Sequence, residues 1–359
     1  MKVDIVDPPA FTPPYDRCLS AALAASPAAP EVRLVTSEFA YGDVPVADGY
    51  SVSESFYRHV AGAPGSRLRR LTRLASHVPE MLRYRADARD RDIVHFQWLT
   101  VQPLDQHLIP RRMPVVITAH DVLPREPRPG QLRAQRRLYE KADAVVVHSQ
   151  HGLRRLEQIG VDRARVIPHG AFTHLAALEP QIPLELSDDG RPVVAMVGLL
   201  RQYKGLDVLY RAWEARRPDC QLWVCGMPRM RLPPAPDGAQ VVARFLRDSE
   251  LAGVLRRADL VVMPYREIDQ SGILFAALGL ARPLLLSAVG GFPEIADLGA
   301  AVTVAPGDPV ALGDAICRLM ADRDGRQRLA QAAASAAAGP LSWKAAAAAH
   351  LELYEDLLR

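Results

Sequence analysis

Short runs of valine, isoleucine and leucine recur along the first half of this chain. Between them lie stretches in which apolar residues return every three or four positions. Uninterrupted apolar runs predict strands buried on both faces, and the helical spacing predicts helices that cover them. The predicted strands are residues 3–7, 31–37, 92–97, 114–121, 144–149 and 165–170, and the clearest helices are residues 130–143 and 150–160. This alternation predicts an α/β fold with a doubly wound parallel sheet.

The pattern pauses after Gly170 and then starts again. The stretch that follows Gly170 is polar and punctuated by prolines, so we expect the linker there. The next predicted strands are residues 191–200, 220–226, 239–245, 259–265, 283–289 and 300–306, with helices at 206–217, 249–258, 271–281 and 308–322. We therefore expect two Rossmann-like domains, residues 1–175 and 190–340, facing a cleft, followed by a final helix in residues 341–359.

Composition places the chain among ordinary globular proteins. It has 359 residues, of which 49% are hydrophobic and 24% charged, with four scattered cysteines. That length suits two hydrophobic cores. The start lacks the pattern of a signal peptide, and no apolar run reaches the roughly 18 residues that span a bilayer. We expect a cytoplasmic enzyme. A net charge of +3 does not favour a nucleic-acid partner.

Residues 67–91 are unusually basic. They contain eight arginines against three acidic residues, with leucines interleaved. One interpretation is a solvated helix, because arginine is the common cation of this chain. The other is a peripheral contact with an anionic membrane at the inner face.

Four histidines lie at the carboxyl ends of predicted strands of the first half, namely His95, His120, His148 and His169. If the strands are parallel, we expect all four to point toward one crevice. A polar sugar pocket is the favoured use of them, because the short ligand spacings of zinc motifs are missing. His120, followed by Asp121, is the strongest candidate in this half.

In the second half, the sequence GLLRQYKGL joins a strand to a helix. Gly198 and Gly205 permit tight turns, while Arg201 and Lys204 place two cations near the free amides of the helix. Such a loop fits a diphosphate leaving group without a metal. Neither GxxxxGK[ST] nor GxGxxG occurs, which argues against a kinase, an ATPase or an ordinary dehydrogenase. Gly226 ends the neighbouring strand and joins the candidate donor-binding set.

A third cluster follows the strand that ends at Pro264. Glu267 and Asp269 lie in a loop, and Ser271 and Gly272 open a helix whose amides face the same predicted cleft. Carboxylates there can hold sugar hydroxyls. The alternative is that Ser271 or Asp269 only caps the helix.

The combination VVVHSQHGLRRL, VIPHGAF, GLLRQYKGLDVLYRA, ADLVVMPY, SGILFAALGLARP and GGFPEIAD resembles family four of the GT-B glycosyltransferases. The resemblance implies transfer of a hexosyl group from a nucleoside-diphosphate sugar, with retention and without a metal. It implies that Arg201 and Lys204 bind the diphosphate, and that His120 lies beside the transferred sugar. It also implies that Phe245 and Leu246 lie near the base, and that the last helix braces the first domain.

Three departures from the family pattern leave other functions open. DPPAFTPPYD replaces the glycine-rich turn after the first strand, Leu199 replaces a donor cation, and Ala276 stands where the second family glutamate is expected. Two alternatives are a catalytically impaired partner or scaffold module and a sugar-nucleotide epimerase. The acceptor is not identified by any motif.

Overall fold

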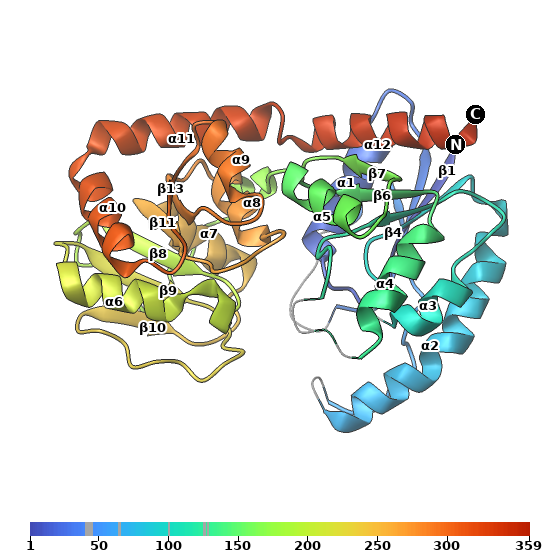
Figure 1. The fold of residues 1–359 in the computed structure, drawn as a ribbon, viewed down its shortest axis with the longest axis horizontal. Coiled ribbons are helices and arrows are strands. Elements are labelled where there is room, and N and C mark those ends of the chain that lie inside the picture. Colours follow the sequence, from blue (N-terminus) through green and yellow to red (C-terminus); the bar gives the residue numbers. More distant parts are fainter. Residues whose placement is uncertain (40–45, 64–65, 100, 125–126, 128) are drawn as a thin grey trace. The chain divides into compact units, whose positions relative to one another are not determined.

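The computed structural model describes residues 1–39, 46–63, 66–99, 101–124, 127 and 129–359. The chain divides into two compact units (Figure 1). Unit 1 comprises Met1–Gly170 and Trp343–Arg359, and unit 2 comprises Ala171–Ser342. The end of the chain therefore returns to the unit in which the chain begins.

The described strands of unit 1 form a seven-stranded sheet in the order β3-β2-β1-β4-β5-β6-β7. Every neighbouring pair is parallel. The strands are β1 (Lys2–Asp7), β2 (Glu31–Thr36), β3 (Ser51–Glu54), β4 (Ile93–Phe96), β5 (Val115–Thr118), β6 (Ala144–Val147) and β7 (Ala164–Val166). The predicted parallel sheet is confirmed for this half.

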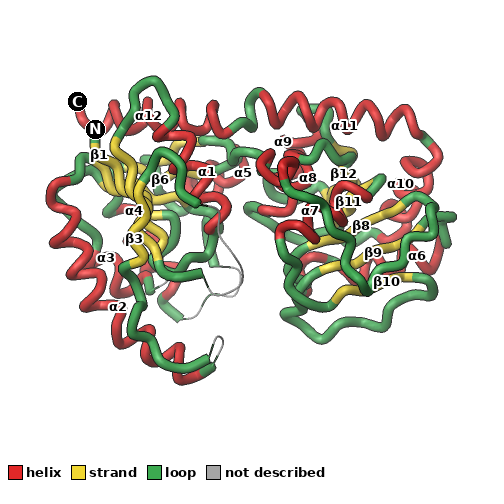
Figure 2. Tube along the Cα trace, turned by 180° about the vertical axis from the view of Figure 1, so that it is seen from behind, coloured by secondary structure: helices red, strands yellow, loops and turns green. Residues whose placement is uncertain are grey.

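Helices cover this sheet on both faces (Figure 2). They are α1 (Pro13–Ala24), α2 (Arg67–Asp87), α3 (Gln102–Leu108), α4 (Gln131–Glu140), α5 (Gln150–Gln158) and α12 (Trp343–Leu358), with the short turn η1 (Ala88–Asp90). Successive side chains of a strand point to opposite faces. Val94 and Phe96 of β4 accordingly join one core with Met81 and Tyr84 of α2. His95, between them, faces the other way, and its Nδ1 lies 2.6 Å from the Tyr354 hydroxyl of α12.

Unit 2 contains a six-stranded sheet of described strands in the order β10-β9-β8-β11-β12-β13, again parallel throughout. Its strands are β8 (Val193–Val197), β9 (Gln221–Cys225), β10 (Ala239–Val242), β11 (Leu260–Met263), β12 (Leu284–Ser287) and β13 (Ala301–Val304). Its helices are η2 (Thr173–Ala177), η3 (Gln202–Lys204), α6 (Leu206–Arg216), α7 (Asp248–Arg257), α8 (Gly272–Gly279), α9 (Phe292–Asp297), α10 (Pro309–Ala321) and α11 (Arg323–Ala338). The second predicted sheet is likewise confirmed.

Helix α12 packs against α1 (Figure 1). Tyr354 is fully buried there, and Trp343 lies 5.2 Å from Tyr15 of α1, measured between ring centroids. A Cβ atom at Gly170 would collide with the Trp343 indole, so only glycine fits at that position. The expectation that the last helix braces the first domain is confirmed.

Strand β3 and helices α1 and α3 are not among the elements expected from the pattern. Strand β3 lies at one edge of the described sheet, and none of its residues is buried, so its sequence SVSE shows no apolar run. Helix α1 begins within a proline-rich stretch, where Pro13 occupies the first turn. Within the described residues, none of the helices combines the length and apolar character that crossing a bilayer requires.

Candidate functional site

The candidate site in unit 2 is built on two glycines at the ends of neighbouring strands. Gly198 follows β8 with φ 112°, and Gly226 follows β9 with φ 151°. The Gly198 amide donates to the Cys225 carbonyl over 2.9 Å, and a Cβ at Gly226 would overlap the Gly198 carbonyl. A Cβ at Gly198 would lie 3.1 Å from Lys204 Nζ. Gly226 therefore lets the two strand-end turns approach each other closely, and Gly198 lies beside the Lys204 amine.

Lys204 is buried at the end of η3. Its Nζ lies 5.0 Å from the centre of the Tyr265 ring, a cation–π contact that stabilises the ammonium. Gly205, with φ 69°, then turns the chain into α6 so tightly that a Cβ would collide with the Pro264 carbonyl. A buried ammonium at strand ends beside tight backbone turns is suited to an anionic ligand.

Arg201 lies on the same loop but is exposed. Its carbonyl accepts a hydrogen bond from the Lys204 amide over 3.0 Å, so the two cations are spaced by one short turn. Arg266 follows β11, and its guanidinium donates hydrogen bonds of 2.6 and 2.9 Å to Asp207 of α6. Arg266 therefore fixes the loop after β11 to α6.

The polar residues of the loop between β11 and α8 differ in their exposure to solvent. Asp269 and Ser271 are buried, whereas Glu267 and Gly272 are exposed. Ser271 stands at the N-cap of α8, but its side chain makes no capping hydrogen bond to the described backbone. The capping explanation is therefore wrong for Ser271. Nε2 of Gln270 is buried without a hydrogen-bond partner among the described residues, which is the arrangement expected of a donor that faces a ligand.

Phe245 and Leu246 lie in the loop between β10 and α7. Phe245 is 39% exposed and Leu246 is buried. The adjacent Arg244 is anchored by Glu185 at 2.7 Å and by Glu250 at 2.8 Å. The hydrogen bond to Glu250 has the largest effect and raises the pKa of Arg244 above its usual value, and the bond to Glu185 raises it further. The ion pairs hold this loop in place and leave the Phe245 ring at the surface. Ala276 is 2% exposed within α8.

In unit 1, three histidines gather around Tyr15. The ring centres of His120, His148 and His169 lie 4.7, 5.3 and 4.8 Å from that of Tyr15. His148 Nε2 lies 3.3 Å from His120 Nδ1. Burial lowers the pKa of each of them, to about 4 for His148, so the group is neutral near pH 7. Neutral imidazoles can both donate and accept hydrogen bonds, as sugar hydroxyls require.

His120 is also fixed by its neighbours. The Trp98 indole stacks on it with an interplanar angle of 15°, and Nε2 lies 3.2 Å from Gln97 Oε1. Nε2 of Gln97 is buried without a hydrogen-bond partner among the described residues. The polar edge of this cluster therefore keeps unused hydrogen-bonding capacity.

The expectation that four histidines point to one crevice was wrong for His95. His95 lies within β4 rather than after it, and it bonds Tyr354 at 2.6 Å and the Thr118 hydroxyl at 2.7 Å. Its role is to join β4 and β5 to α12. The sequence could not show this, because the partner Tyr354 lies far away along the chain. Among the described histidine, cysteine, aspartate and glutamate side chains, no group of three or more is arranged to hold a metal ion.

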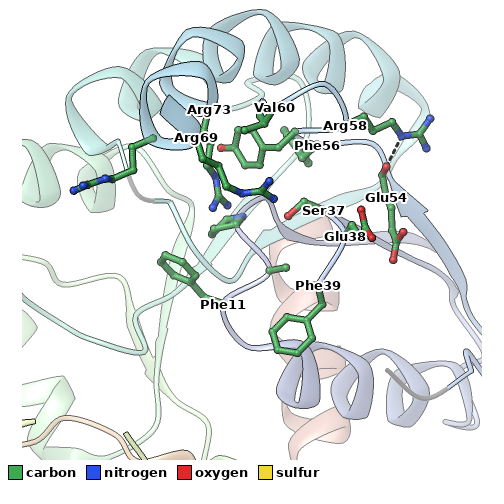
Figure 3. Close-up of a pocket in the computed structure, with 14 residues that line it drawn as sticks. Phe11, Ser37, Glu38, Phe39, Glu54, Phe56, Arg58, Val60, Arg69 and Arg73 are labelled. Carbon is green, nitrogen blue, oxygen red and sulfur yellow. Dashed lines mark hydrogen bonds between the residues drawn. The ribbon is translucent and has the colours of Figure 1, made fainter. Parts of the chain in front are cut away.

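Unit 1 also contains a pocket of 540 Å³ at the carboxyl ends of β1, β2 and β3 (Figure 3). The first half of α2 supplies Arg69, Arg70 and Arg73 to its lining. The remaining lining residues are Pro9, Ala10, Phe11, Ser37, Glu38, Phe39, Glu54, Phe56, Tyr57, Arg58 and Val60. The sequence pattern did not identify this pocket. Its one signal was the excess of arginine in residues 67–91.

Two family models match the chain. The model described as "Glycosyltransferase Family 4" matches residues 19–174, and that described as "Glycosyl transferases group 1" matches residues 191–322. The two matches follow one another and together span most of the chain.

Curated relatives match part of the chain. A D-inositol 3-phosphate glycosyltransferase of Corynebacterium jeikeium is 30% identical over 65% of this chain and 62% of its own length. An α-maltose-1-phosphate synthase of Mycolicibacterium smegmatis is 29% identical over 68% of this chain and 73% of its own length. The chain thus matches less than two thirds of the first of these relatives.

Solved structures share the fold over nearly the whole chain. A sucrose-phosphate synthase of Thermosynechococcus elongatus superposes with a TM-score of 0.76 at 19% identity, over 99% of both chains. The HepE protein of Anabaena, solved with UDP and glucose, gives 0.73 at 16% identity, over 99% of this chain and 100% of its own. A putative UDP-N-acetylglucosamine 2-epimerase of Listeria monocytogenes gives 0.62 at 16% identity, over 99% and 96%. At such identities the likeness establishes the GT-B fold alone.

Proposed function

Because this chain belongs to the group 1, family 4 glycosyltransferases, we propose that it transfers a hexosyl group from a nucleoside-diphosphate sugar to an acceptor, with retention. The observation that carries this proposal is Lys204, whose ammonium is buried beside the Gly198 turn and over the Tyr265 ring. A scaffold has no use for a buried cation at the strand ends.

The chemistry of unit 2 fits a leaving nucleoside diphosphate. Negative charge grows on the diphosphate as the bond to the sugar breaks, so cations fixed in advance stabilise the transition state. Lys204 offers a compact charge, and Arg201 can offer a planar fork from the exposed side of the same loop. The Gly198 backbone lies beside the Lys204 amine, where we place the phosphates, and Gly226 permits the close turn that supports it. In this proposal no metal is required.

The other assignments concern the base and the sugar. The exposed ring of Phe245, with Leu246 behind it, is suited to the nucleoside base. Ser271 and Gly272 present the free amides of α8 to the donor. We assign Asp269 and Glu267 to hydroxyls of the sugar. His120 is assigned to the transferred sugar as a neutral hydrogen-bonding group.

Two other functions share this fold. The first alternative is a sugar-nucleotide epimerase. The structural likeness to a putative epimerase does not favour it over a transferase, because one fold serves several chemistries. The scaffold alternative is motivated by Ala276 and by DPPAFTPPYD in place of the glycine-rich turn. The buried Lys204 argues against it.

A panel of UDP-, GDP- and dTDP-sugars, supplied without acceptor, distinguishes the transferase, the epimerase and the scaffold. We expect calorimetry to detect binding of one donor class and slow release of the nucleoside diphosphate. An altered sugar configuration on an intact nucleotide, read by proton NMR, would identify an epimerase. Failure of every sugar nucleotide to bind would leave the scaffold.

For the unidentified acceptor side, we propose a peripheral contact between α2 and an anionic membrane. Leu68, Leu71, Leu74 and Leu82 are exposed large apolar side chains on this helix. Exposed leucines among arginines are typical of helices that lie on a lipid surface. Such a contact suits a cytoplasmic enzyme at the inner membrane face.

A further inference from the structure

The first half of α2 places its side chains opposite to the usual arrangement of a surface helix. Leu68, Leu71 and Leu74 are 55%, 66% and 50% exposed. Arg69 and Arg73 are partly buried, and both line the 540 Å³ pocket of unit 1. Burying apolar surface is favourable and desolvating a cation is costly. A bound anionic ligand would explain why these arginines point inward and these leucines point outward.

Arg73 is the most constrained of these cations. Its guanidinium carbon lies 4.3 Å from the centre of the Tyr57 ring, and its Nη2 is buried without a hydrogen-bond partner among the described residues. A desolvated guanidinium nitrogen with no acceptor is costly unless something else supplies one.

The neighbouring arginines are also available. Arg69 Nη1 donates only a long bond of 3.3 Å to the Gly62 carbonyl. No described carboxylate lies within 4.0 Å of the guanidinium groups of Arg69, Arg70 or Arg73, by contrast with Arg33, which bonds Asp4 at 2.7 Å elsewhere in the same unit. The pocket is lined by four arginines and two glutamates, so positive charge is in excess there, and the α2 arginines form no direct ion pair with a described carboxylate.

The opposite wall of the pocket is different in character. Ser37 and Glu38 follow β2, and Glu54 ends β3. Arg58 donates to the Glu54 carbonyl and is thereby held at that wall (Figure 3). Carboxylate and hydroxyl oxygens accept hydrogen bonds from hydroxyl groups. The pocket thus has a cationic end at α2 and an acceptor-rich end at the sheet.

We propose that this pocket binds the acceptor through an anionic group, a phosphate ester or a carboxylate, held by Arg73 with Arg69 and Arg70. The inference rests on the proposed transferase function and names the class of its acceptor: a polyhydroxylated molecule with an anion at one end. A guanidinium fork matches phosphate and carboxylate geometry. The hydroxyls face Ser37 and Glu38. A volume of 540 Å³ lies within the usual range of small-molecule sites.

The test measures binding without any donor. Glucose 6-phosphate, inositol phosphates, a hexuronate and inorganic phosphate are titrated by calorimetry, with the matching neutral sugars as references. We expect at least one anion to bind and its neutral counterpart to bind at least tenfold more weakly. Arg73→Gln should lower the affinity for the anion roughly 10- to 100-fold. Arg73→Lys keeps the charge and should lower this affinity less.

Arg83→Gln is the matched control, because Arg83 is an exposed arginine of the same helix outside the pocket. Its anion affinity should equal that of the wild type, and thermal melting confirms that each variant is folded. The proposal is overturned if neither a soluble anion nor an anionic vesicle binds, if neutral sugars bind equally well, or if Arg73→Gln and Arg83→Gln behave alike.

The anion can belong to a soluble molecule or to a lipid headgroup. Tight binding of a small phosphate ester, unchanged in Leu71→Ser, identifies the soluble source. Binding only to phosphatidylglycerol or phosphatidylinositol vesicles, lost in both Arg73→Gln and Leu71→Ser, identifies the lipid. A protein that binds the anion but no sugar nucleotide would contradict the proposed function and leave this pocket in place. The reverse result overturns the pocket alone.

Discussion

Lys204 and Asp7 show how burial shapes the chemistry of single residues here. The chain has four lysines, and Lys204 is buried whereas Lys141 and Lys344 are exposed. Asp7 is fully buried at the end of β1, where one carboxylate oxygen accepts hydrogen bonds from the amides of Phe11 and Thr12 at 2.7 and 3.1 Å. Both groups are charged in water at neutral pH, and both sit where water is excluded.

We expect Lys204→Ala to lower kcat roughly 100-fold and to weaken nucleoside-diphosphate binding, because the lost charge counters charge that grows on the leaving group. Lys344→Ala is the control, since Lys344 is exposed on α12. Steady-state kinetics with the cognate donor and calorimetry with the free nucleotide measure the two effects. Unchanged turnover and affinity in Lys204→Ala would remove the lysine from the donor site.

Asp7 predicts a stability change with pH. Burial raises its pKa to about 6, opposed by the hydrogen bond with the Asp16 carboxyl, by those from the Thr12 and Phe11 amides and by the charge of Arg73. A raised carboxyl pKa contributes stability that is full below about 3.8 and is lost as the pH rises through about 6. Asp7→Asn keeps an acceptor oxygen and cannot ionise. We expect it to be more stable than the wild type at pH 8, by on the order of 2 kcal/mol, with no such gain at pH 4.

Denaturant unfolding at the two pH values measures this difference. Asp162→Asn, at an exposed position of unit 1, should show no comparable pH-dependent gain. An equal effect of Asp7→Asn at pH 4 and pH 8 would show that ionisation of Asp7 does not contribute.

At the scale of elements, α2 performs two tasks with two faces. His77, Glu80, Met81 and Tyr84 bury its second half against the sheet, whereas the first half carries the pocket arginines. Arg91, after the helix, is committed to Asp90 and Glu31 at 2.8 Å each. The surface offered to a membrane is therefore narrower than residues 67–91.

We expect the protein to sediment with phosphatidylglycerol vesicles at low salt and to be released as salt rises, because surface charges are screened within roughly 10 Å at 0.1 M. Leu71→Ser should reduce the bound fraction several-fold, since Leu71 is 66% exposed on this helix. Leu132→Ser, at an exposed leucine of α4, is the control. Absence of sedimentation at low salt would leave α2 a solvated helix.

At the scale of the whole molecule, the last helix makes unit 1 from two distant parts of the chain. Tyr354 of α12 is fully buried, and its hydroxyl lies 2.6 Å from His95 of β4. The free energy of unfolding of unit 1 therefore depends on residues that follow unit 2 in the sequence.

We expect Tyr354→Ala to destabilise unit 1 by about 3 to 5 kcal/mol, because it leaves a cavity and an unsatisfied His95. Tyr354→Phe should cost about 1 to 3 kcal/mol, because it removes only the hydroxyl. Glu355→Ala, at the exposed neighbour, should be near neutral. Denaturant unfolding of the full chain measures all three, and equal stability of Tyr354→Ala and Glu355→Ala would contradict the bracing role.

The sequence by itself determined both parallel sheets, since buried strands such as β6 and β8 must be continuous apolar runs and their helices must show helical spacing. It also predicted the Lys204 loop as a candidate site, because glycines and cations were adjacent along the chain. It did not show β3, which lacks an apolar run, or the true partner of His95. The inward turn of Arg73 was equally hidden. Those features depend on residues that are distant in the sequence and meet only after folding. The spacing of apolar residues along the sequence shows which face of a helix or strand is apolar, but not what the opposite face contacts. Tertiary structure alone therefore decided that the basic segment of α2 lines a pocket and that Tyr354 of α12 bonds His95 of β4.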